Sequence, residues 1–437
     1  MENSVLSVVS EAALTALARE TGFIERVRKL TPKNWLLTLL FCQHQQKKTS
    51  LEDFACDFLS HQGEIVSDVA FHKKFNRRAV SFLKQILQRF ISSPLEPSLK
   101  HSFSRVLVRD STKFLLPNTC KDDYPGFGKP DKASSVMNIQ YEYELLSHQW
   151  QEVSLGSVRI NDQKDAQDST DIARENDLIL RDLGYINLKT IGQIIDAKAF
   201  FVSRLPAHPL VFLSSGEPFN WKKINAHIKK HKLKRYVVEV KIGDKERIPV
   251  RLVLEPVSEK LKAHRIKKAK KKSKRRNVKG LTDLYKMRQG YNLFITNTVP
   301  EQIPDHEVSA VYRLRWQIEL MFRTWKSELN VDKVRTKKSE RVECEVLAKM
   351  IWMIIHNRML QLADAHLTET IGHRQISPEK FFKRAKLLNA MTRKWMDGEL
   401  SLILWAKKVY IPIIKCARQQ IREDRRNYTQ VIKHVLS

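Results

Sequence analysis

The stretch YRLRWQIELMFRTWK, residues 312–326, carries the pattern that decides the fold. In a helix that advances about 100° per residue, four of its polar side chains lie within about 60° of one another: Tyr312, Arg315, Glu319 and Lys326. Six apolar side chains fill the adjoining face: Leu314, Ile318, Met321, Phe322, Trp325 and Leu329. The pattern predicts one helix from Ala310 to Leu329. Its polar stripe is either a functional site or an ion-pair ladder on a surface helix.

Upstream of this helix, short apolar runs predict strands that alternate with helices, as in an α/β core. One strand runs into Asp110, and another, at Leu178–Leu180, ends at Asp182 after a predicted helical stretch at Ala173–Asn176. Further strands are expected around Ile139–Leu145, Val153–Leu155 and Phe200–Val202. An Asp at the end of a strand is usually a turn or cap residue. Two of them in one core favour a shared site modestly.

Cleavage and joining of phosphodiesters need negative charge to be neutralised and a water or 3'-hydroxyl to be activated, which divalent metal ions accomplish. Hard cations such as Mg²⁺ prefer carboxylate oxygens as ligands. About three acidic side chains that converge from different elements would suit such a site.

The order and spacing of Tyr312, Arg315, Glu319 and Lys326 form the YREK signature. On this signature the sequence resembles the bacterial insertion-sequence transposases of the fourth class, which include the enzyme of the fifth-numbered composite transposon. The resemblance covers roughly residues 50–363. It includes the Asp110-Ser111-Thr112 strand, the Asp182-Leu183-Gly184-Tyr185 turn and the Phe201-Val202-Ser203-Arg204-Leu205 strand.

The resemblance implies an α/β protein with an RNase H-like catalytic core that is interrupted by a β-rich insertion and flanked by helical N-terminal and C-terminal regions. It implies a DDE triad, Asp110, Asp182 and Glu319, that binds Mg²⁺ or Mn²⁺, with two ions expected. Tyr312, Arg315 and Lys326 would hold phosphates near the end of the transposon. The expected enzyme cuts the terminal inverted repeats and joins their 3'-hydroxyl ends to target DNA, acting as a homodimer on DNA.

The sequence departs from that family at two positions. Family members often have Arg where Leu183 stands, and some have a Trp at the position of Asn292 that stacks on a flipped base. Here Tyr291 is the neighbouring aromatic residue. Its ring is expected either to stack on a base or to pack at the edge of a strand.

The N-terminal region contains a candidate helix-turn-helix. Ser50 and Asp53 form a capping box, Gly63 occupies the linking turn, and a second helix begins near Ser67. Four cations on this second helix are candidate DNA contacts: Lys73, Lys74, Arg77 and Arg78. An ordinary solvated helical face is an equally good interpretation.

The patterns divide the chain into five segments. These are a helical DNA-binding region (1–95), the first part of the core (96–205), the β-strand insertion with a basic linker (206–300), the YREK-helix part of the core (301–365) and a helical C-terminal region (366–437). A hairpin turning at Gly243 and Asp244 is expected within the insertion. Ser377 and Pro378 are expected to begin a helix in the last segment.

The net charge of +30 predicts a polyanionic partner, with DNA favoured over a membrane surface. The densest basic run, Lys260–Lys279, has 12 Lys and Arg and no acidic residue. It is expected to be a solvated, mobile linker that attracts phosphates, with contacts from Lys267, Lys268, Lys270 and Lys271. The charge left outside this run indicates that the basicity extends along the chain.

Five scattered cysteines without zinc-type spacing favour a reducing compartment. No secretory segment or membrane span is expected, so the predicted location is the bacterial cytoplasm, in association with the nucleoid. Two alternatives stay open: an RNase H-like endonuclease that cuts without strand transfer, and a catalytically inactive DNA-binding protein.

Overall fold

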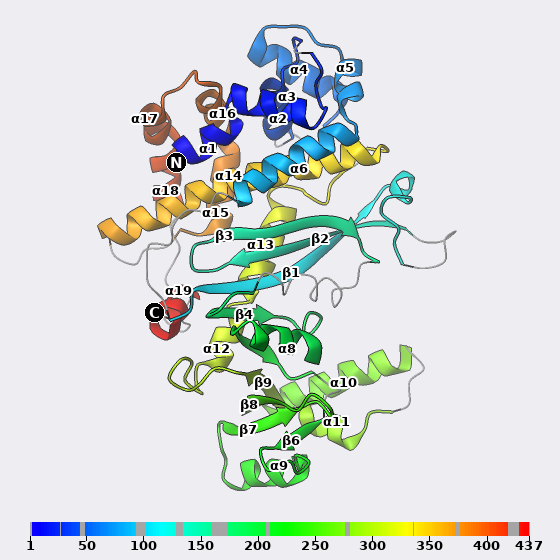
Figure 1. Cartoon of the computed structure of the whole chain (residues 1–437), viewed down its shortest axis with the longest axis vertical. Coiled ribbons are helices and arrows are strands. Elements are labelled where there is room, and N and C mark those ends of the chain that lie inside the picture. Colours follow the sequence, from blue (N-terminus) through cyan, green and yellow to red (C-terminus); the bar gives the residue numbers. More distant parts are fainter. Residues whose placement is uncertain are drawn as a thin grey trace. The chain divides into compact units, whose positions relative to one another are not determined.

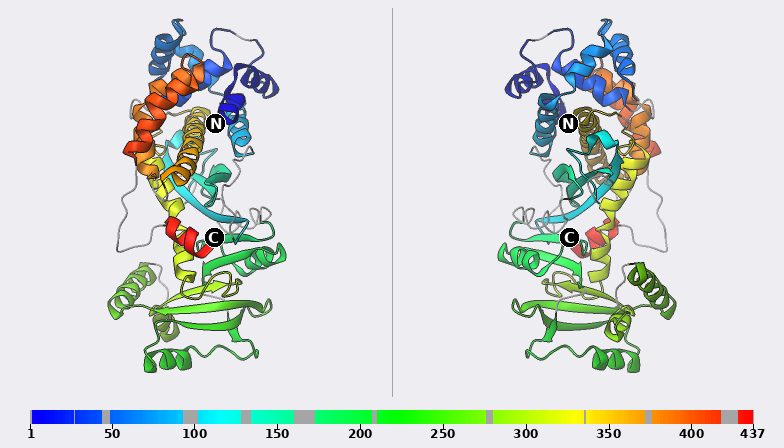
Figure 2. Two further views of the ribbon diagram at one scale, coloured as in Figure 1. Left: turned by 90° about the vertical axis from the view of Figure 1, so that its left-hand side faces the viewer. Right: turned by 90° about the vertical axis from the view of Figure 1, so that its right-hand side faces the viewer.

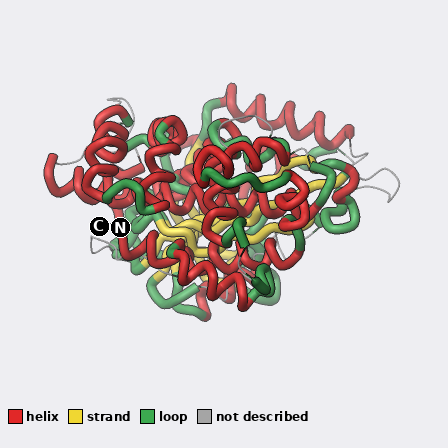
Figure 3. The backbone as a smooth tube through the Cα atoms, turned by 90° about the horizontal axis from the view of Figure 1, so that it is seen from above, coloured by secondary structure: helices red, strands yellow, loops and turns green. Residues whose placement is uncertain are grey.

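A computed structural model describes residues 2–26, 28–43, 49–92, 102–127, 134–159, 173–206, 210–275, 280–334, 336–371, 376–417 and 428–436. The chain forms two compact units, each assembled from three segments. Unit 1 comprises residues 1–98, 111–159 and 318–422, and unit 2 comprises residues 99–110, 160–317 and 423–437. Both units contain helices and strands. Figure 3 distinguishes the two kinds of element by colour along the chain. The chain is therefore mixed α/β.

The N-terminal segment of unit 1 consists of helices. They are α1 (Glu2–Val9), α2 (Glu11–Glu20), α3 (Pro32–Cys42), α4 (Leu51–Gln62), α5 (Asp68–Lys74) and α6 (Arg77–Ile91). The predicted capping box is present, since the Ser50 hydroxyl accepts from the Asp53 amide and the Asp53 carboxylate accepts from the Ser50 amide. Gly63 ends α4 with a φ of 68°, a left-handed conformation that glycine adopts without strain.

The rest of unit 1 consists of strands followed by helices (Figure 1). The strands are the second half of β1 (Arg105–Leu116), β2 (Ser135–Glu144) and β3 (Gln149–Ser157), in the order β3-β2-β1. The helices are α13 (Trp316–Ser327), α14 (Ser339–Ile371), α15 (Pro378–Leu387), α16 (Asn389–Asp397), α17 (Leu402–Trp405) and α18 (Ile411–Cys416). Ser377 caps α15 as predicted. Within the described residues, no helix has the length and apolar character needed to cross a membrane.

The strands of unit 2 follow the order β1-β4-β5-β9-β8-β7-β6. The first half of β1 pairs in parallel with β4 (Asp177–Arg181), and β4 pairs in parallel with β5 (Phe200–Arg204). The helix α8 (Leu188–Asp196) connects β4 to β5. Strand β9 (Tyr291–Thr296) pairs antiparallel with β5 on one side and with β8 on the other. It thereby joins the strands of the insertion to the sheet.

The insertion has the predicted hairpin, formed by β7 (Tyr236–Ile242) and β8 (Ile248–Pro256). Gly243, at the predicted turn, has a φ of 89°. The insertion also contains β6 (Val211–Leu213) and the helices α9 (Trp221–Lys230), α10 (Glu259–Arg275) and α11 (Asp283–Arg288). Its apolar core continues into that of α8 and β5, with Ile194, Phe201 and Leu252 all buried.

Three predicted elements in the first half of the chain differ from the structure. Residues 173–176 form a turn and no helix, with Asn176 at a φ of 63°, and the preceding residues 160–172 lie outside the described part. The helix expected from Ser67 onward is broken at Asn76, whose side chain accepts from the Ala79 amide and caps α6. Asn is a strong N-cap residue, and this preference outweighs the continuous apolar pattern. The strand leading to Asp110 does not end there but continues to Leu116.

The basic run predicted as a mobile linker is a helix over most of its length. Helix α10 spans Glu259–Arg275, and residues 276–279 lie outside the described part. Ser258 begins the helix, because its hydroxyl accepts from the Leu261 amide. Lys, Ala, Leu and Arg are good helix formers, so local propensity prevails over repulsion between the charges.

The helix predicted from Ala310 to Leu329 is two helices, α12 (Val308–Arg313) and α13. Between them the backbone makes tighter turns, in which the Leu314 amide donates to Val311 O at 2.9 Å and the Arg315 amide donates to Tyr312 O at 3.2 Å. A three-residue turn rotates more per residue than an α-helix, so the predicted single stripe is interrupted here. The six apolar side chains of the predicted inner face are nevertheless all buried.

Candidate active site

Asp110, within β1, and Asp182, directly after β4, lie at the same level of two neighbouring parallel strands. The pairing of β1 with β4 runs in register from Arg105 with Asp177 to Arg109 with Arg181. Asp110 and Asp182 are the next residue on each strand. Because adjacent strands lie about 4.8 Å apart, this register brings the two carboxyl-bearing residues to one edge of the pair. A turn follows Asp182, where the Tyr185 amide donates to Asp182 O at 2.9 Å.

Two residues of the YREK signature contact these two carboxylates. The Arg315 guanidinium donates to Asp110 Oδ2 at 3.2 Å, and the Tyr312 hydroxyl donates to Asp182 Oδ1 at 3.4 Å. The side chains of Asp110 and Arg315 are 22% and 13% exposed, so the ion pair stands at the border between interior and solvent. Four of the six predicted catalytic residues therefore meet within unit 2.

Tyr312 is buried and packed by its neighbours. Its ring centroid lies 5.4 Å from that of Phe294, and the guanidinium of Arg204 lies 5.6 Å from the Tyr312 ring. Burial raises the pKa of the Tyr312 hydroxyl, and the nearby Asp182 carboxylate adds to the rise. The hydroxyl thus stays protonated and able to donate.

The sequence-based list of site residues omits Arg204. It is the only charged residue of β5, and its side chain is exposed beside Tyr312. Arginine recognises phosphate through a planar pair of donors. One signal in the sequence could have identified Arg204: it is a lone Arg at the end of an apolar strand, within the Phe201–Leu205 motif.

Glu319 and Lys326 belong to unit 1, on α13. Both side chains are partly exposed, whereas Phe322 and Trp325 on the adjoining face are buried. The Trp325 ring stacks at 5.4 Å on Trp150 and lies 4.8 Å from Tyr141, which fixes the rotation of the helix against β2 and β3. The Lys326 ammonium donates to the main-chain oxygen of Lys113 in β1 at 3.2 Å.

The three predicted metal ligands, Asp110, Asp182 and Glu319, are all carboxylates. Hard divalent cations prefer such oxygen ligands. Within the described ranges, no group of three or more His, Cys, Asp or Glu side chains is arranged to hold a metal ion. In unit 2, Asp110 and Asp182 are instead hydrogen-bonded by Arg315 and Tyr312.

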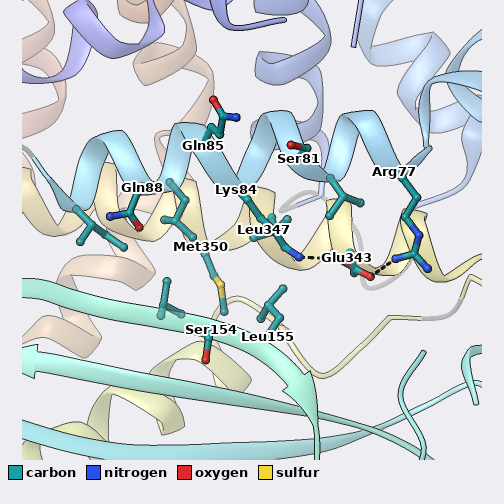
Figure 4. Close-up of a pocket in the computed structure, with 14 residues that line it drawn as sticks. Arg77, Ser81, Lys84, Gln85, Gln88, Ser154, Leu155, Glu343, Leu347 and Met350 are labelled. Carbon is teal, nitrogen blue, oxygen red and sulfur yellow. Dashed lines mark hydrogen bonds and ion pairs between the residues drawn. The ribbon is translucent and has the colours of Figure 1, made fainter. Parts of the chain in front are cut away.

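Among the N-terminal candidate DNA contacts, Arg77 forms ion pairs with acidic side chains of the protein itself. It lines a cavity of about 630 Å³ bounded by α6, β3 and α14, where it points toward Glu343 (Figure 4). Its guanidinium lies 3.0 Å from Glu343 and also contacts Asp123, and Lys84 approaches Glu343 at 3.5 Å. The Glu343 side chain is only 4% exposed, so these cations compensate a buried charge.

The other three N-terminal cations differ in their surroundings. Lys74 lies 4.7 Å from the Phe23 ring centroid, and burial lowers the pKa of its ammonium. Arg78 contacts the exposed Glu25 and the main-chain oxygen of Gly22. Lys73 is exposed. The solvated-face interpretation therefore describes part of this helix pair.

We predict that Arg77→Ala lowers the stability of the protein, because it removes the cation that lies closest to the buried Glu343 carboxylate. A cost of about 1–3 kcal/mol is expected for a buried group that loses its partner. Thermal unfolding followed by circular dichroism measures the effect, with the exposed Lys73→Ala as the matched control. An Arg77→Ala variant that melts like the wild type but binds DNA weakly would show instead that Arg77 is a DNA contact.

Tyr291 is packed inside the insertion. Its side chain is 7% exposed within the apolar core, and its hydroxyl donates to Asn225 on α9 at 2.8 Å. Burial raises the pKa of this hydroxyl. The structure favours the packed aromatic over the base-stacking ring, since the ring face is covered by apolar neighbours.

The chain matches a known protein family. Residues 101–355, more than half of the chain, match the family described as the transposase DDE domain. The matched segment includes Asp110, Asp182 and Glu319.

Several curated relatives are similar over most of their length. The transposase for insertion sequence element IS231F of Bacillus thuringiensis subsp. israelensis is 31% identical over 367 residues, which cover 77% of this chain and 75% of that protein. The transposase for insertion sequence element IS1151 of Clostridium perfringens is 26% identical over 394 residues, which cover 84% and 82%.

Among solved structures, the piggyBac transposase in a synaptic complex with hairpin DNA covers 98% of this chain and 87% of its own, with 10% identity and a TM-score of 0.42. That similarity is too weak to bear on the fold or the site. The family match and the insertion-sequence relatives are decisive without it: the chain belongs to the transposase DDE-domain family and is a DDE transposase.

Proposed function

We infer that this transposase works by cut-and-paste transposition and belongs to the YREK class of insertion-sequence enzymes. It cleaves the terminal inverted repeats of its element and joins the freed 3'-hydroxyl ends to target DNA. The observation that carries the proposal is the arrangement in unit 2, where Arg315 and Tyr312 contact Asp110 and Asp182 at one edge of parallel strands. The parallel β1, β4 and β5 and the antiparallel β2 and β3 support an RNase H-like core.

Asp110, Asp182 and Glu319 are the proposed metal ligands. Their oxygen donors fit Mg²⁺ or Mn²⁺, and Asp110 and Asp182 emerge together from adjacent strands. Two ions bound there would neutralise charge on the phosphate and make water or a 3'-hydroxyl nucleophilic. Arg315 and Tyr312 donate hydrogen bonds to these two Asp carboxylates in the structure, and the same donors can instead bind phosphate oxygens.

Arg315, Tyr312 and Lys326 are proposed to hold the phosphates at the end of the element. A guanidinium offers two-point contact to phosphate, an ammonium offers a point charge, and a protonated Tyr hydroxyl donates one hydrogen bond. Together these groups would orient the scissile phosphodiester for attack. The exposed Arg204, beside Tyr312, is added to this set.

DNA contacts outside the site are proposed for Lys73, Lys74 and Arg78 and for the lysines of α10: Lys267, Lys268, Lys270 and Lys271. The helical C-terminal region is proposed to form a homodimer on DNA, and the place of action is the nucleoid in the cytoplasm.

Cleavage of a labelled fragment that carries the element's own end tests the proposed function. Mg²⁺-dependent cleavage at the boundary of the element is expected, with none in EDTA. A protein that binds the end but never cleaves it, with Mg²⁺ or Mn²⁺, would be the catalytically inactive DNA-binding alternative.

Affinity for DNA should depend steeply on salt, because a chain of net charge +30 releases counterions when it binds. For six to ten phosphate contacts, affinity should fall roughly 10³-fold or more between 50 and 200 mM salt. Fluorescence anisotropy with a labelled duplex measures this dependence. A flat response across the range would contradict electrostatic binding.

A further inference from the structure

The positive charge of the chain is concentrated in the insertion, residues 206–300. This segment has 25 Lys and Arg against 7 Asp and Glu, a net of +18 out of the total of +30. The sequence-based expectation that the basicity extends along the chain is therefore only partly right. Figure 2 shows α10, the most basic helix of the insertion, standing to the side of its strands.

One face of α10 is anchored to strand β9 of the same unit. Arg265 donates to Tyr291 O at 3.1 Å and to Asn292 Oδ1 at 2.7 Å, both on β9. Ile266 and Ala269, on the same side, are partly buried. The helix is thus held to the sheet near the start of its length, with one narrow face turned inward.

The second half of α10 carries a row of six exposed lysines: Lys267, Lys268, Lys270, Lys271, Lys272 and Lys274. Across the described residues, no ion pair connects any of these six to an acidic side chain. Among the side chains of this helix that the structure describes, Lys262 forms an ion pair with Glu259 at 3.2 Å. Arg77 on α6, by contrast, contacts three acidic residues. The charge of α10 is consequently available to an external polyanion.

We propose that α10 is the target-DNA surface of the transposase, a helix that binds duplex phosphates without regard to sequence. The proposal rests on the proposed function and assigns this helix to one of the two DNAs that the reaction needs. Its occupant is the target duplex, and the ends of the element are held by Arg315 and its neighbours.

The composition of the exposed face distinguishes target from end. Phosphate contacts alone carry no sequence information, and Lys binds phosphate as a point charge. The exposed residues from Lys267 to Lys274 are all lysines, with no Asn, Gln, Asp or Glu among them to distinguish the bases. An inverted repeat has a fixed sequence, whereas target DNA varies, so a sequence-blind surface suits the target. At about 1.5 Å per residue, 17 residues span about 25 Å, or roughly seven base pairs of duplex.

The test removes four charges from α10 in the full-length protein. The variant carries Lys267→Gln, Lys268→Gln, Lys270→Gln and Lys271→Gln, since Gln keeps helix propensity while losing the charge. Two controls match it. One replaces the same four lysines with Arg, and the other replaces four exposed lysines of α9 with Gln: Lys222, Lys223, Lys229 and Lys230.

Three readouts separate the roles: affinity for a duplex of random sequence without metal, cleavage of the element's end, and joining of precleaved ends to a target plasmid. For the α10 Gln variant, the log-log salt slope for random duplex should decrease by about 3.6, at about 0.9 for each lost phosphate contact. Joining should fall in parallel and by more than end cleavage, because the ends of the element are held by Arg315 and its neighbours. The Arg variant should behave like the wild type.

Three results would overturn the proposal: an unchanged salt slope, an equal loss of end cleavage and joining, or an equal loss in the α9 variant. Equal losses in cleavage and joining would assign α10 to the ends instead. Failure of the wild type to cleave or join, despite a normal effect of α10 on duplex binding, would count against the proposed function and against the target role together. If the wild type neither cleaved nor joined but the α10 Gln variant still changed the salt slope, α10 would be a general DNA-binding helix without an assigned role in joining.

Discussion

Asp110→Ala, Asp182→Ala and Glu319→Ala should each reduce end cleavage by roughly 10³-fold or more. Each change removes one proposed metal ligand. Lewis-acid stabilisation by a bound metal is worth several kcal/mol, and about 1.4 kcal/mol corresponds to a factor of ten. The measurement is single-turnover cleavage of a labelled end fragment in Mg²⁺, with the affinity for the same fragment measured in parallel.

End binding should survive these three changes, because the phosphates are assigned to other side chains. Glu319→Asp is the conservative control, since it keeps the charge and shortens the reach by one methylene. Partial activity that improves with Mn²⁺ is expected for this variant. Near wild-type cleavage by any one of the three Ala variants would remove that residue from the metal-binding set.

Arg315→Ala should fail in a different way from Glu319→Ala. It removes a two-point phosphate donor, and losing one such preorganised donor costs roughly 10²-fold in rate. The cleaved position should become imprecise, and higher metal concentration should not restore the rate. Mapping of the cut site across a Mg²⁺ titration measures both effects.

Arg315→Lys and Lys326→Ala extend this comparison. Lys keeps the charge of Arg315 but not its planar fork, so Arg315→Lys should recover binding more than precision. Lys326→Ala should weaken the hold on the end in the same manner as Arg315→Ala. Correct cuts at the wild-type rate by both Ala variants would make the YREK pattern an ion-pair ladder with no role in the reaction.

Much of the fold was predictable because local patterns agreed with tertiary packing. The capping box at Ser50, the turn at Gly243 and the strand that ends beside Asp182 all appear where the sequence places them. Each depends on a short-range preference: a hydroxyl cap, a left-handed glycine, a buried apolar run.

The errors arise where tertiary contacts or a competing local preference decide the structure. No Pro or Gly marks the break at Leu314 and Arg315, which is flanked by the contacts of Tyr312 and Arg315 with the two carboxylates. The continuation of β1 beyond Asp110 depends on its neighbour β2, a long-range pairing that no short window contains.

The candidate site was predictable in its residue types but not in its partners. The signature spacing identified Tyr312 and Arg315, whereas their pairing with Asp182 and Asp110 needed the parallel register of β1 and β4. Charge counting singled out Arg77 and the lysines of α10 alike. Only the structure separates Arg77, which is paired with Glu343, from the exposed lysine row.

The central claim, cutting followed by joining, is tested most directly by a strand-transfer assay. Purified protein is incubated in Mg²⁺ with a labelled fragment that carries both ends of its element and with an unrelated target plasmid, and the products are sequenced across the junctions. The predicted product has the 3' ends of the element covalently joined to the plasmid, flanked by a short direct duplication of target sequence. Cleaved fragments with no joined product, under conditions in which the ends are cut to completion, would contradict the account and identify an endonuclease without strand transfer.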